Sequence, residues 1–94
     1  MNYEIMCILD PTLDEETTQK ELENFENILK QNKVESVEFD KWGLRELAYE
    51  IKKHNKGYYV ILKVKTEDSK SIDEFDRLTR INKNVLRHLI IRKD

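Results

Sequence analysis

The sequence predicts an α+β fold in which two helices cover one face of a four-stranded antiparallel sheet. Four segments of the 94-residue chain carry the apolar pattern of strands, and two carry apolar residues at helical spacing. Along the chain they follow the order strand, helix, strand, strand, helix, strand. Short connections and the right-handedness of crossovers favour a ferredoxin-like sandwich for this order. We expect one domain, residues 1–94, because a chain of this length supports a single modest core.

The first strand is expected in the segment NYEIMCILD, whose side chains alternate between two faces. One face carries Ile5, Cys7 and Leu9. The other carries Met6 and Ile8, so the strand is apolar on much of both faces. The only proline of the chain follows, and it ends the strand because proline supplies no amide hydrogen to a sheet.

A helix is expected next, capped by Thr12 or Asp14 and running to about Gln31. The acidic residues in its first turn suit the positive end of the helix dipole. The side opposite its apolar stripe is charged and therefore faces solvent. The buried stripe consists of Leu22, Phe25, Ile28 and Leu29.

The middle of the chain predicts a long hairpin. Residues 34–51 alternate as one strand that is interrupted at Gly43, and a lone glycine in a strand pattern marks a bulge or a sharp bend. The segment KKHNKG, residues 52–57, is expected to form the turn, and YYVILKVK the returning strand. The better apolar face of that strand consists of Tyr58, Val60, Leu62 and Val64.

A second helix and a last strand complete the pattern. The helix is expected to start at Ser69 or Ser71, the latter with Glu74 in a capping box. The segment NKN ends the helix, and VLRHLIIR forms the last strand. The buried stripe of the helix consists of Ile72, Phe75 and Leu78.

Helices cover only one face of such a sheet, so the other face meets water or a partner. The side chains expected on this helix-free face are more apolar than a bare sheet usually tolerates, which indicates a surface that binds a protein. Scattered apolar residues are also normal on protein surfaces, and this explanation stays open. The candidate partner-binding residues are Met6, Ile8, Tyr59 and Ile61.

Charge is distributed unevenly along the chain. Residues 1–40 contain 11 acidic and 3 basic side chains, a net charge of −8, whereas residues 41–94 contain 8 acidic and 14 basic side chains, a net charge of +6. The segment from Arg77 to Lys93 has six basic residues and no acid. Such asymmetry indicates an anionic partner such as nucleic acid. Cations that suit the end of a helix dipole are the alternative, but the basic run continues into the following strand.

Signals for enzymatic chemistry are weak. Two glycines cannot form a glycine-rich phosphate loop. Cys7 and His88 could lie on neighbouring strands like a nucleophile pair, but a buried structural cysteine is the simpler explanation. His54 has no cysteine near it that would complete a metal site. We therefore expect no enzyme activity, metal, cofactor or small-molecule substrate.

The location is expected to be the cytoplasm. The single cysteine provides no disulfide framework, which is the usual condition of proteins in a reducing compartment. The N-terminus lacks the basic start of a signal peptide. No apolar run approaches the length of about 20 residues that a membrane helix needs, so no membrane is expected as a partner.

The segment from Lys56 to Lys63, KGYYVILK, begins like the core motif of RNA-recognition domains and lies on the third strand of the same topology. It then departs from that motif, because Tyr59 stands where a small residue is expected and Val60 and Lys63 replace aromatic residues. The platform on which bases stack is therefore missing. We expect basic side chains to contact the backbone and shape of RNA in a salt-sensitive manner.

The segment GLRELAYEIKK, preceded by KW and followed by KGYYVI, resembles the signature of the bacterial small-subunit ribosomal protein number six family. The similarity continues through YEIMCILDPTLDEE near the start and SIDEFDRLTRINKNVLRHLIIR near the end, so it spans essentially the whole chain. The signature residues that match are Gly43, Arg45, Glu46, Leu47, Ala48, Tyr49, Ile51 and Lys52.

The resemblance implies a ferredoxin-like RNA-binding domain without catalytic activity, located on the small ribosomal subunit. It implies binding to the central domain of 16S ribosomal RNA, as a heterodimer with the small basic ribosomal protein number eighteen. Because that partner is basic, the chain itself need not be basic overall. The kinked hairpin around Gly43 then serves as a shape element.

Seven residues are candidates for contact with the RNA. Arg80, Arg87 and Arg92 are expected to contact phosphates, with Arg45 and Lys52 as further candidates. Two tyrosines could pack on a sugar or a base, or could equally serve the core or the sheet. These are Tyr3 and Tyr49.

Two other functions remain as alternatives. The first is a homodimeric ferredoxin-like regulatory or ligand-binding module, which would need a glycine-rich or charged pocket between subunits. The second is an enzyme of the ferredoxin-like barrel type, which would need a polar cluster on the sheet face. The apolar residues expected on that face argue against the enzyme.

Overall fold

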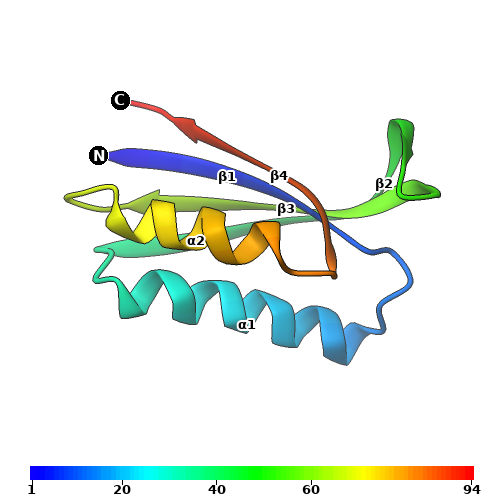
Figure 1. Ribbon diagram of the computed structural model, residues 1–94, viewed down its shortest axis with the longest axis horizontal. Helices are drawn as coiled ribbons and strands as arrows, with labels where there is room; N and C mark the ends of the chain where they lie inside the picture. The colour runs from blue at the N-terminus through cyan, green and yellow to red at the C-terminus, as the bar shows by residue number, and fades with distance from the viewer.

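The computed structural model describes residues 1–94 and confirms the expected order of elements. Two helices lie side by side on one face of an antiparallel sheet with the strand order β2-β3-β1-β4 (Figure 1). The strands are β1 (Asn2–Leu9), β2 (Ser36–Ile51), β3 (His54–Lys65) and β4 (Val85–Arg92). The helices are α1 (Glu15–Gln31) and α2 (Lys70–Arg80). This is the predicted ferredoxin-like sandwich. Neither helix has the length and apolar character that crossing a membrane requires.

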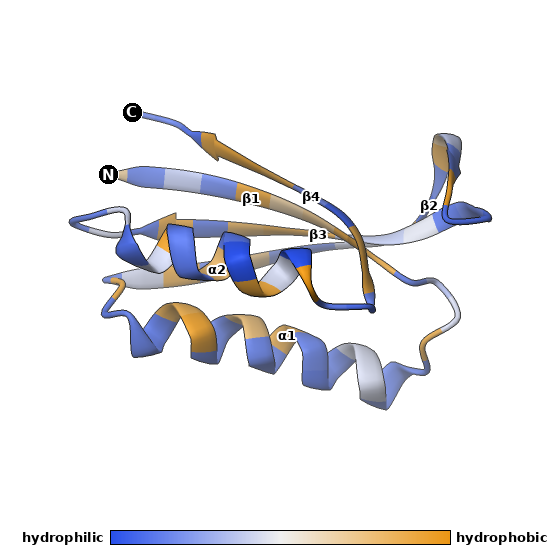
Figure 2. Cartoon of the chain, viewed as in Figure 1, coloured by the Kyte–Doolittle hydropathy of each residue, from blue (hydrophilic) through white to orange (hydrophobic).

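The core lies between the sheet and the helices. Side chains of the two central strands meet in register, with Ile5 opposite Leu62 and Cys7 opposite Val60. The rings of Phe25 and Phe75 join the two helices edge to face, with centroids 5.4 Å apart. The sides of the helices that face away from the sheet are mostly hydrophilic (Figure 2). The predicted periodicities of strands and helices are thus confirmed.

One of the two residues predicted to cap helix α1 is its N-cap in the structure. Asp14 is the N-cap, and its carboxylate accepts a hydrogen bond of 2.7 Å from the Thr17 amide. Thr12 is not the cap, because its amide and hydroxyl both donate to the carboxylate of Asp10. The expected end at Gln31 is also confirmed.

The start of α2 corrects the predicted capping box. The helix begins after Ser69, whose side chain makes no capping hydrogen bond, and the amide of Lys70 instead donates to the Asp68 carboxylate at 3.0 Å. Ser71 lies inside the helix and is fully buried, so it cannot pair with Glu74 in a capping box. Glu74 instead accepts hydrogen bonds from a neighbouring arginine.

The buried stripe of α2 also differs in part from the prediction. Ile72 and Phe75 are buried as expected, but Leu78 is only partly buried. Thr79 is buried in addition and satisfies its hydroxyl by donating to the Phe75 carbonyl at 2.8 Å. A threonine can occupy a buried helix position because its hydroxyl can donate a hydrogen bond to a backbone carbonyl in the preceding turn of the helix.

Strand β2 confirms the bulge expected at Gly43. Its pairing with β3 shifts between Lys41 and Gly43, and Gly43 has a φ angle of +79°. A second irregularity follows, in which residues 47–50 oppose Asn55 alone. The family signature is therefore a strand that is bent twice.

The turn of the hairpin is shorter than predicted. Ile51 pairs with His54, so only Lys52 and Lys53 form the turn, and β3 begins at His54 rather than after Gly57. Both lysines have positive φ angles, 48° and 68°. Two-residue hairpin turns of this kind match the twist of the flanking strands, which lets the ladder continue to the tip.

Candidate RNA and protein interface

The four residues expected to bind a protein partner lie on the helix-free face. In the register of β1 and β3, Met6 is opposite Ile61 and Ile8 is opposite Tyr59. Ile8 and Ile61 are nevertheless only 3% and 7% exposed, whereas Met6 and Tyr59 are partly buried. The apolar surface open to a partner is therefore smaller than the alternation of residues predicts.

The bent end of the hairpin explains the burial of Ile8. Its tip turns to the side of the sheet opposite the helices (Figure 1). A small cavity of about 160 Å³ remains between the hairpin and the sheet. It is lined by Leu47, Ala48, Tyr49 and Ile51 of β2 and by Met6, Ile8, Tyr59 and Arg87. The LAY segment of the signature thus lies over the helix-free face.

Gly57 allows the hairpin to lie this close. A Cβ atom at Gly57 would be only 2.3 Å from Cγ2 of Ile8, a distance that two carbon atoms cannot share. Ile8 therefore packs directly against the hairpin backbone. Position 57 requires glycine because a side chain there would collide with Ile8. Position 43 favours glycine because its positive φ angle is unfavourable for other residues.

The structure brings together two of the residues expected to contact RNA. The guanidinium of Arg87, on β4, lies 5.6 Å from the ring centroid of Tyr49, on the hairpin. Arg87 also donates a hydrogen bond to the Tyr49 hydroxyl. Tyr49 is 60% exposed, so it presents one part of its ring to solvent while the other holds the arginine.

A second aromatic group on this face was missed by sequence reasoning. The rings of Trp42 and Tyr59 stack with centroids 6.3 Å apart and an interplanar angle of 11°. Arg45 lies over Trp42 at 5.8 Å from the ring centroid. Trp42 is 46% exposed. The bulge before Gly43 adds one residue to β2 at this point, so simple alternation could not assign the face of Trp42. The available signal was the position of the only tryptophan beside a glycine.

Arg80 belongs to a cluster that joins α2 to β4. The Asp76 carboxylate contacts Nε2 of His88 at 2.7 Å and accepts a hydrogen bond of 3.0 Å from Nε of Arg80. The contact with His88, followed by the bond and charge of Arg80, lowers the pKa of Asp76. The Arg80 side chain is 69% exposed, so it remains accessible to an anion.

The remaining candidates are dispersed. Nε of Arg92 donates to the Asp94 carboxylate at 3.1 Å near the end of the chain. Lys52 is exposed at the tip of the hairpin. Tyr3 packs against the core, and its hydroxyl contacts the sulfur of Met1 at 3.7 Å, which favours a structural role. The seven candidates therefore do not form one continuous patch.

Cys7 and His88 are cross-strand neighbours, as anticipated, but they do not form a nucleophile pair. Cys7 is fully buried, and this burial raises the pKa of its thiol to about 12. Nε2 of His88 is occupied by Asp76. A thiol that stays protonated at neutral pH is a poor nucleophile, which supports the structural explanation.

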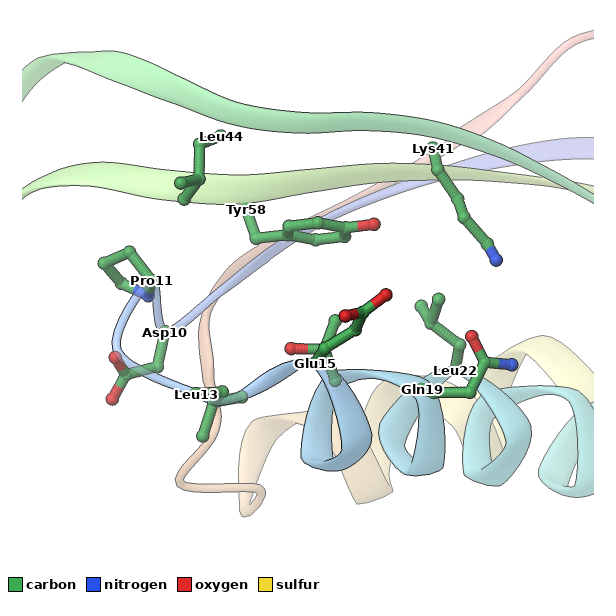
Figure 3. A pocket seen from close by; sticks show the side chains of 10 residues that line it. Asp10, Pro11, Leu13, Glu15, Gln19, Leu22, Lys41, Leu44 and Tyr58 are labelled. Carbon is green, nitrogen blue, oxygen red and sulfur yellow. The ribbon is translucent and has the colours of Figure 1, made fainter.

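A larger cavity, of about 480 Å³, lies between the start of α1 and the base of the hairpin (Figure 3). Lys41 and Glu15 extend into the space between the sheet and the helix. Hydrogen bonds from the Thr12 side chain and amide lower the pKa of Asp10 at its rim. None of the residues expected to bind RNA or protein lines this cavity.

Comparisons with known proteins give the family. The family model for ribosomal protein S6 matches residues 2–92. The small ribosomal subunit protein bS6 of Carboxydothermus hydrogenoformans is 45% identical over 92 residues, which are 98% of this chain and 95% of that protein.

Solved structures agree with this assignment. The crystal structure of 30S ribosomal protein S6 from Thermotoga maritima has a TM-score of 0.86 and 29% sequence identity, over 98% of this chain and 86% of that chain. A protein from Arabidopsis thaliana has a TM-score of 0.64 at 12% identity, over 100% of this chain and 94% of that chain, and shows the fold alone. The resemblance in GLRELAYEIKK is thus confirmed, and the chain belongs to the ribosomal protein S6 family of the small ribosomal subunit.

Proposed function

We propose that this protein is a non-catalytic component of the small ribosomal subunit in the cytoplasm. In this role it binds the central domain of 16S ribosomal RNA together with the small basic ribosomal protein number eighteen. Membership of the S6 family supports the role. The contact between Arg87 and Tyr49 carries the structural part of the proposal, because it joins the basic last strand to the family signature on one surface.

The groups proposed to contact the RNA are of two kinds and lie at separate places on the molecule. Arg87 with Tyr49, and Arg45 with Trp42, each combine a cation with an exposed ring, which suits a sugar or base edge beside a phosphate. Arg80 and Arg92 offer cations alone. Their present partners, Asp76 and Asp94, hold them through exposed ion pairs, which contribute little and can be exchanged for phosphate. Lys52 is a further cation at the hairpin tip.

The partner protein is proposed to bind on the helix-free face. Met6 and Tyr59 supply the accessible part of the predicted set, and Ile8 and Ile61 form its floor. The exposed Trp42 and Leu89 enlarge the apolar surface beside them. The net charge of −8 over residues 1–40 favours association with a basic protein.

The first experiment measures binding of the chain to a central-domain 16S RNA fragment at two salt concentrations, with and without the basic partner. Tight and salt-sensitive binding only when both proteins are present is expected. Equally tight binding by the chain alone would remove the requirement for a partner. A folded chain that binds under neither condition would overturn the proposed function.

Substitutions then locate the surface. Arg87→Gln is expected to weaken binding to the RNA. Lys30→Gln is the control, because Lys30 is not one of the proposed contacts, lies on α1 and pairs with Glu26. Equal losses from both substitutions would indicate a general effect of charge rather than contact by Arg87.

A further inference from the structure

Strand β4 is an outer strand whose pairing partner is β1 alone. The amide of Lys93 donates to the Asn2 carbonyl at 2.8 Å, and bonded pairs alternate along an antiparallel ladder. Arg87, Leu89 and Ile91 therefore direct their backbone groups toward β1. The backbone amides and carbonyls of His88, Ile90 and Arg92 consequently face outward.

The other side of β1 agrees with this assignment. Met1 and Thr66 exchange hydrogen bonds of 2.8 and 3.0 Å. Because bonded pairs alternate along the ladder, the odd-numbered residues of β1 that follow direct their backbone groups toward β3. The even-numbered residues are left to bond to β4, as the bond between Asn2 and Lys93 requires. The free edge of β4 thus carries three residues with unpaired backbone groups at a spacing of two.

The opposite edge of the sheet does not offer the same surface. Strand β2 has two shifts of register, at Gly43 and at residues 47–50. Bulges of this kind protect an edge against pairing with another strand. The longest regular stretch of pairing between β2 and β3 runs from Ser36 to Lys41, and this stretch carries the acidic Glu38 and Asp40. Strand β4 pairs regularly with β1 from Arg87 to Arg92 and carries basic side chains, so its edge selects a different kind of segment.

The free edge is flanked by exposed apolar side chains on the helix-free face and by a groove of mixed polar and apolar side chains on the helix face. On the helix side, a groove of about 460 Å³ lies between β4 and α2. It is lined by Ile72, Asp73, Asp76, Arg80, His88, Leu89 and Ile90. On the helix-free side, Leu89 and Ile91 are 50% and 44% exposed. An added strand would bury apolar side chains on each face.

The charges along this edge specify its partner. From residue 87 to residue 93 the sequence reads RHLIIRK, with basic or titratable groups at both ends and three apolar residues in the middle. The present partners of these groups are Tyr49 for Arg87, Asp76 for His88, Asp94 for Arg92 and Glu4 for Lys93. The last two pairs are exposed and therefore exchangeable.

A second copy of this chain fits the edge poorly. Antiparallel pairing of two β4 strands about Ile90 would place Lys93 opposite Arg87 at each end of the pair. Like charges directly opposite each other destabilise a strand pair. A segment with carboxylates at both ends is complementary instead.

We propose that the free edge of β4 receives, as a fifth strand, an extended segment of another protein that is acidic at both ends and apolar in the middle. The edge amides and carbonyls of His88, Ile90 and Arg92 supply the main-chain hydrogen bonds, and the flanking cations select the acidic residues. This inference does not rest on the proposed function. Because Arg87 and Arg92 serve in both, an added strand and bound RNA exclude one another.

The test uses a capped peptide, N-acetyl-EEVVVEE-amide, added to the full ¹⁵N-labelled chain. Its pattern complements RHLIIRK in both strand directions, so the direction need not be known. Titration is expected to shift the amide resonances of His88, Ile90 and Arg92 and to slow their hydrogen exchange. The matched controls are two peptides of the same sequence in which every second backbone nitrogen is methylated, starting at an odd residue in one and at an even residue in the other. Methylation removes hydrogen bonds along one side of the strand and leaves the charges unchanged.

Two variants sharpen the result. Ile91→Glu places an acid on the edge strand and is expected to weaken peptide binding about tenfold or more, through like-charge repulsion. Ile81→Glu is the control, because Ile81 is 70% exposed but precedes β4. If both methylated peptides bind as tightly as the unmodified peptide, the proposal is overturned in favour of charge attraction alone. A peptide that shifts none of the three amides would overturn it as well. RNA that protects the same three amides while the peptide does not would assign this edge to nucleic acid.

Discussion

Cγ2 of Ile8 occupies the space where a side chain at Gly57 would begin, 2.3 Å from the position of its Cβ atom. This contact fixes how closely the hairpin approaches the helix-free face. Gly57→Ala forces either Ile8 or the hairpin to move, and overpacking of this kind costs about 1–3 kcal/mol. Urea unfolding measures the loss of stability.

A double-mutant cycle identifies the cause of that loss. Ile8→Ala makes room for the new methyl group, so the combined variant is expected to be more stable than the sum of the two single effects. Additive effects would show that Gly57 is needed for another reason than the contact with Ile8.

The contact between Arg87 and Tyr49 predicts a role in holding the hairpin. Tyr49→Ala removes both the ring and the hydroxyl, so hydrogen exchange of the hairpin amides is expected to become faster, with Tyr49→Phe intermediate. Leu44→Ala is the control, because Leu44 is also 60% exposed on β2 but does not line the cavity beneath the hairpin. Unchanged exchange in Tyr49→Ala would show that the contact does not restrain the hairpin.

Arg80 and Arg77 form a matched pair for the salt dependence of RNA binding. Both lie on α2, both pair with an acid of the same helix, and their side chains are 69% and 64% exposed. Arg80→Gln is expected to reduce the slope of log K against log salt by about one, as loss of one phosphate contact does. Arg77→Gln is expected to leave the slope unchanged. Identical slopes for the two variants would remove Arg80 from the RNA surface.

The Asp76 cluster predicts a contribution to stability at low pH. The contact with His88 and then the interactions with Arg80 lower the pKa of Asp76 in the folded state. A carboxyl whose pKa is lower in the folded than in the unfolded state stabilises the fold at pH values above the unfolded pKa. This stabilisation is lost below about pH 5, as the pH falls through the folded pKa. Asp76→Asn is therefore expected to flatten the loss of stability on acidification, whereas Asp73→Asn on the same helix is the control. Urea midpoints measured from pH 7 to pH 3 provide the comparison.

The buried thiol of Cys7 predicts low reactivity. Its pKa is raised to about 12, and the side chain is fully buried, so iodoacetamide at neutral pH should not modify the folded protein. Modification is expected only in urea, at the rate of an exposed thiol. Mass spectrometry distinguishes the two states, and rapid alkylation of the folded chain would show that β1 opens locally.

The sequence predicted the sandwich well because its core follows simple periods. Ile5, Cys7 and Leu9 alternate, and Phe25 and Phe75 recur within helical stripes, so local pattern and tertiary position agree. Predictions failed where a tertiary choice decided the outcome. The prediction of a capping box at Ser71 was wrong because packing buries that residue. The predicted hairpin turn was longer than the observed one because two lysines adopt positive φ angles and close the turn in two residues.

The interface was less predictable for a related reason. The bulge at Gly43 changes the face on which Trp42 lies, and the bend at residues 47–50 brings the hairpin over Ile8. Neither event follows from alternation, since both depend on how the hairpin folds back on the sheet. The residues expected to bind RNA stay predictions, and the structure places Arg87 and Tyr49 together among them.

The strand order has a consequence for synthesis. Strand β1, the first to leave the ribosome that makes the chain, bonds on one side to β3 and on the other to β4, the last strand. Val85 and Leu86 of β4 are also buried. A nascent chain that still lacks β4 leaves one edge of β1 open and its core incomplete, so the sheet can close only after β4 has been made.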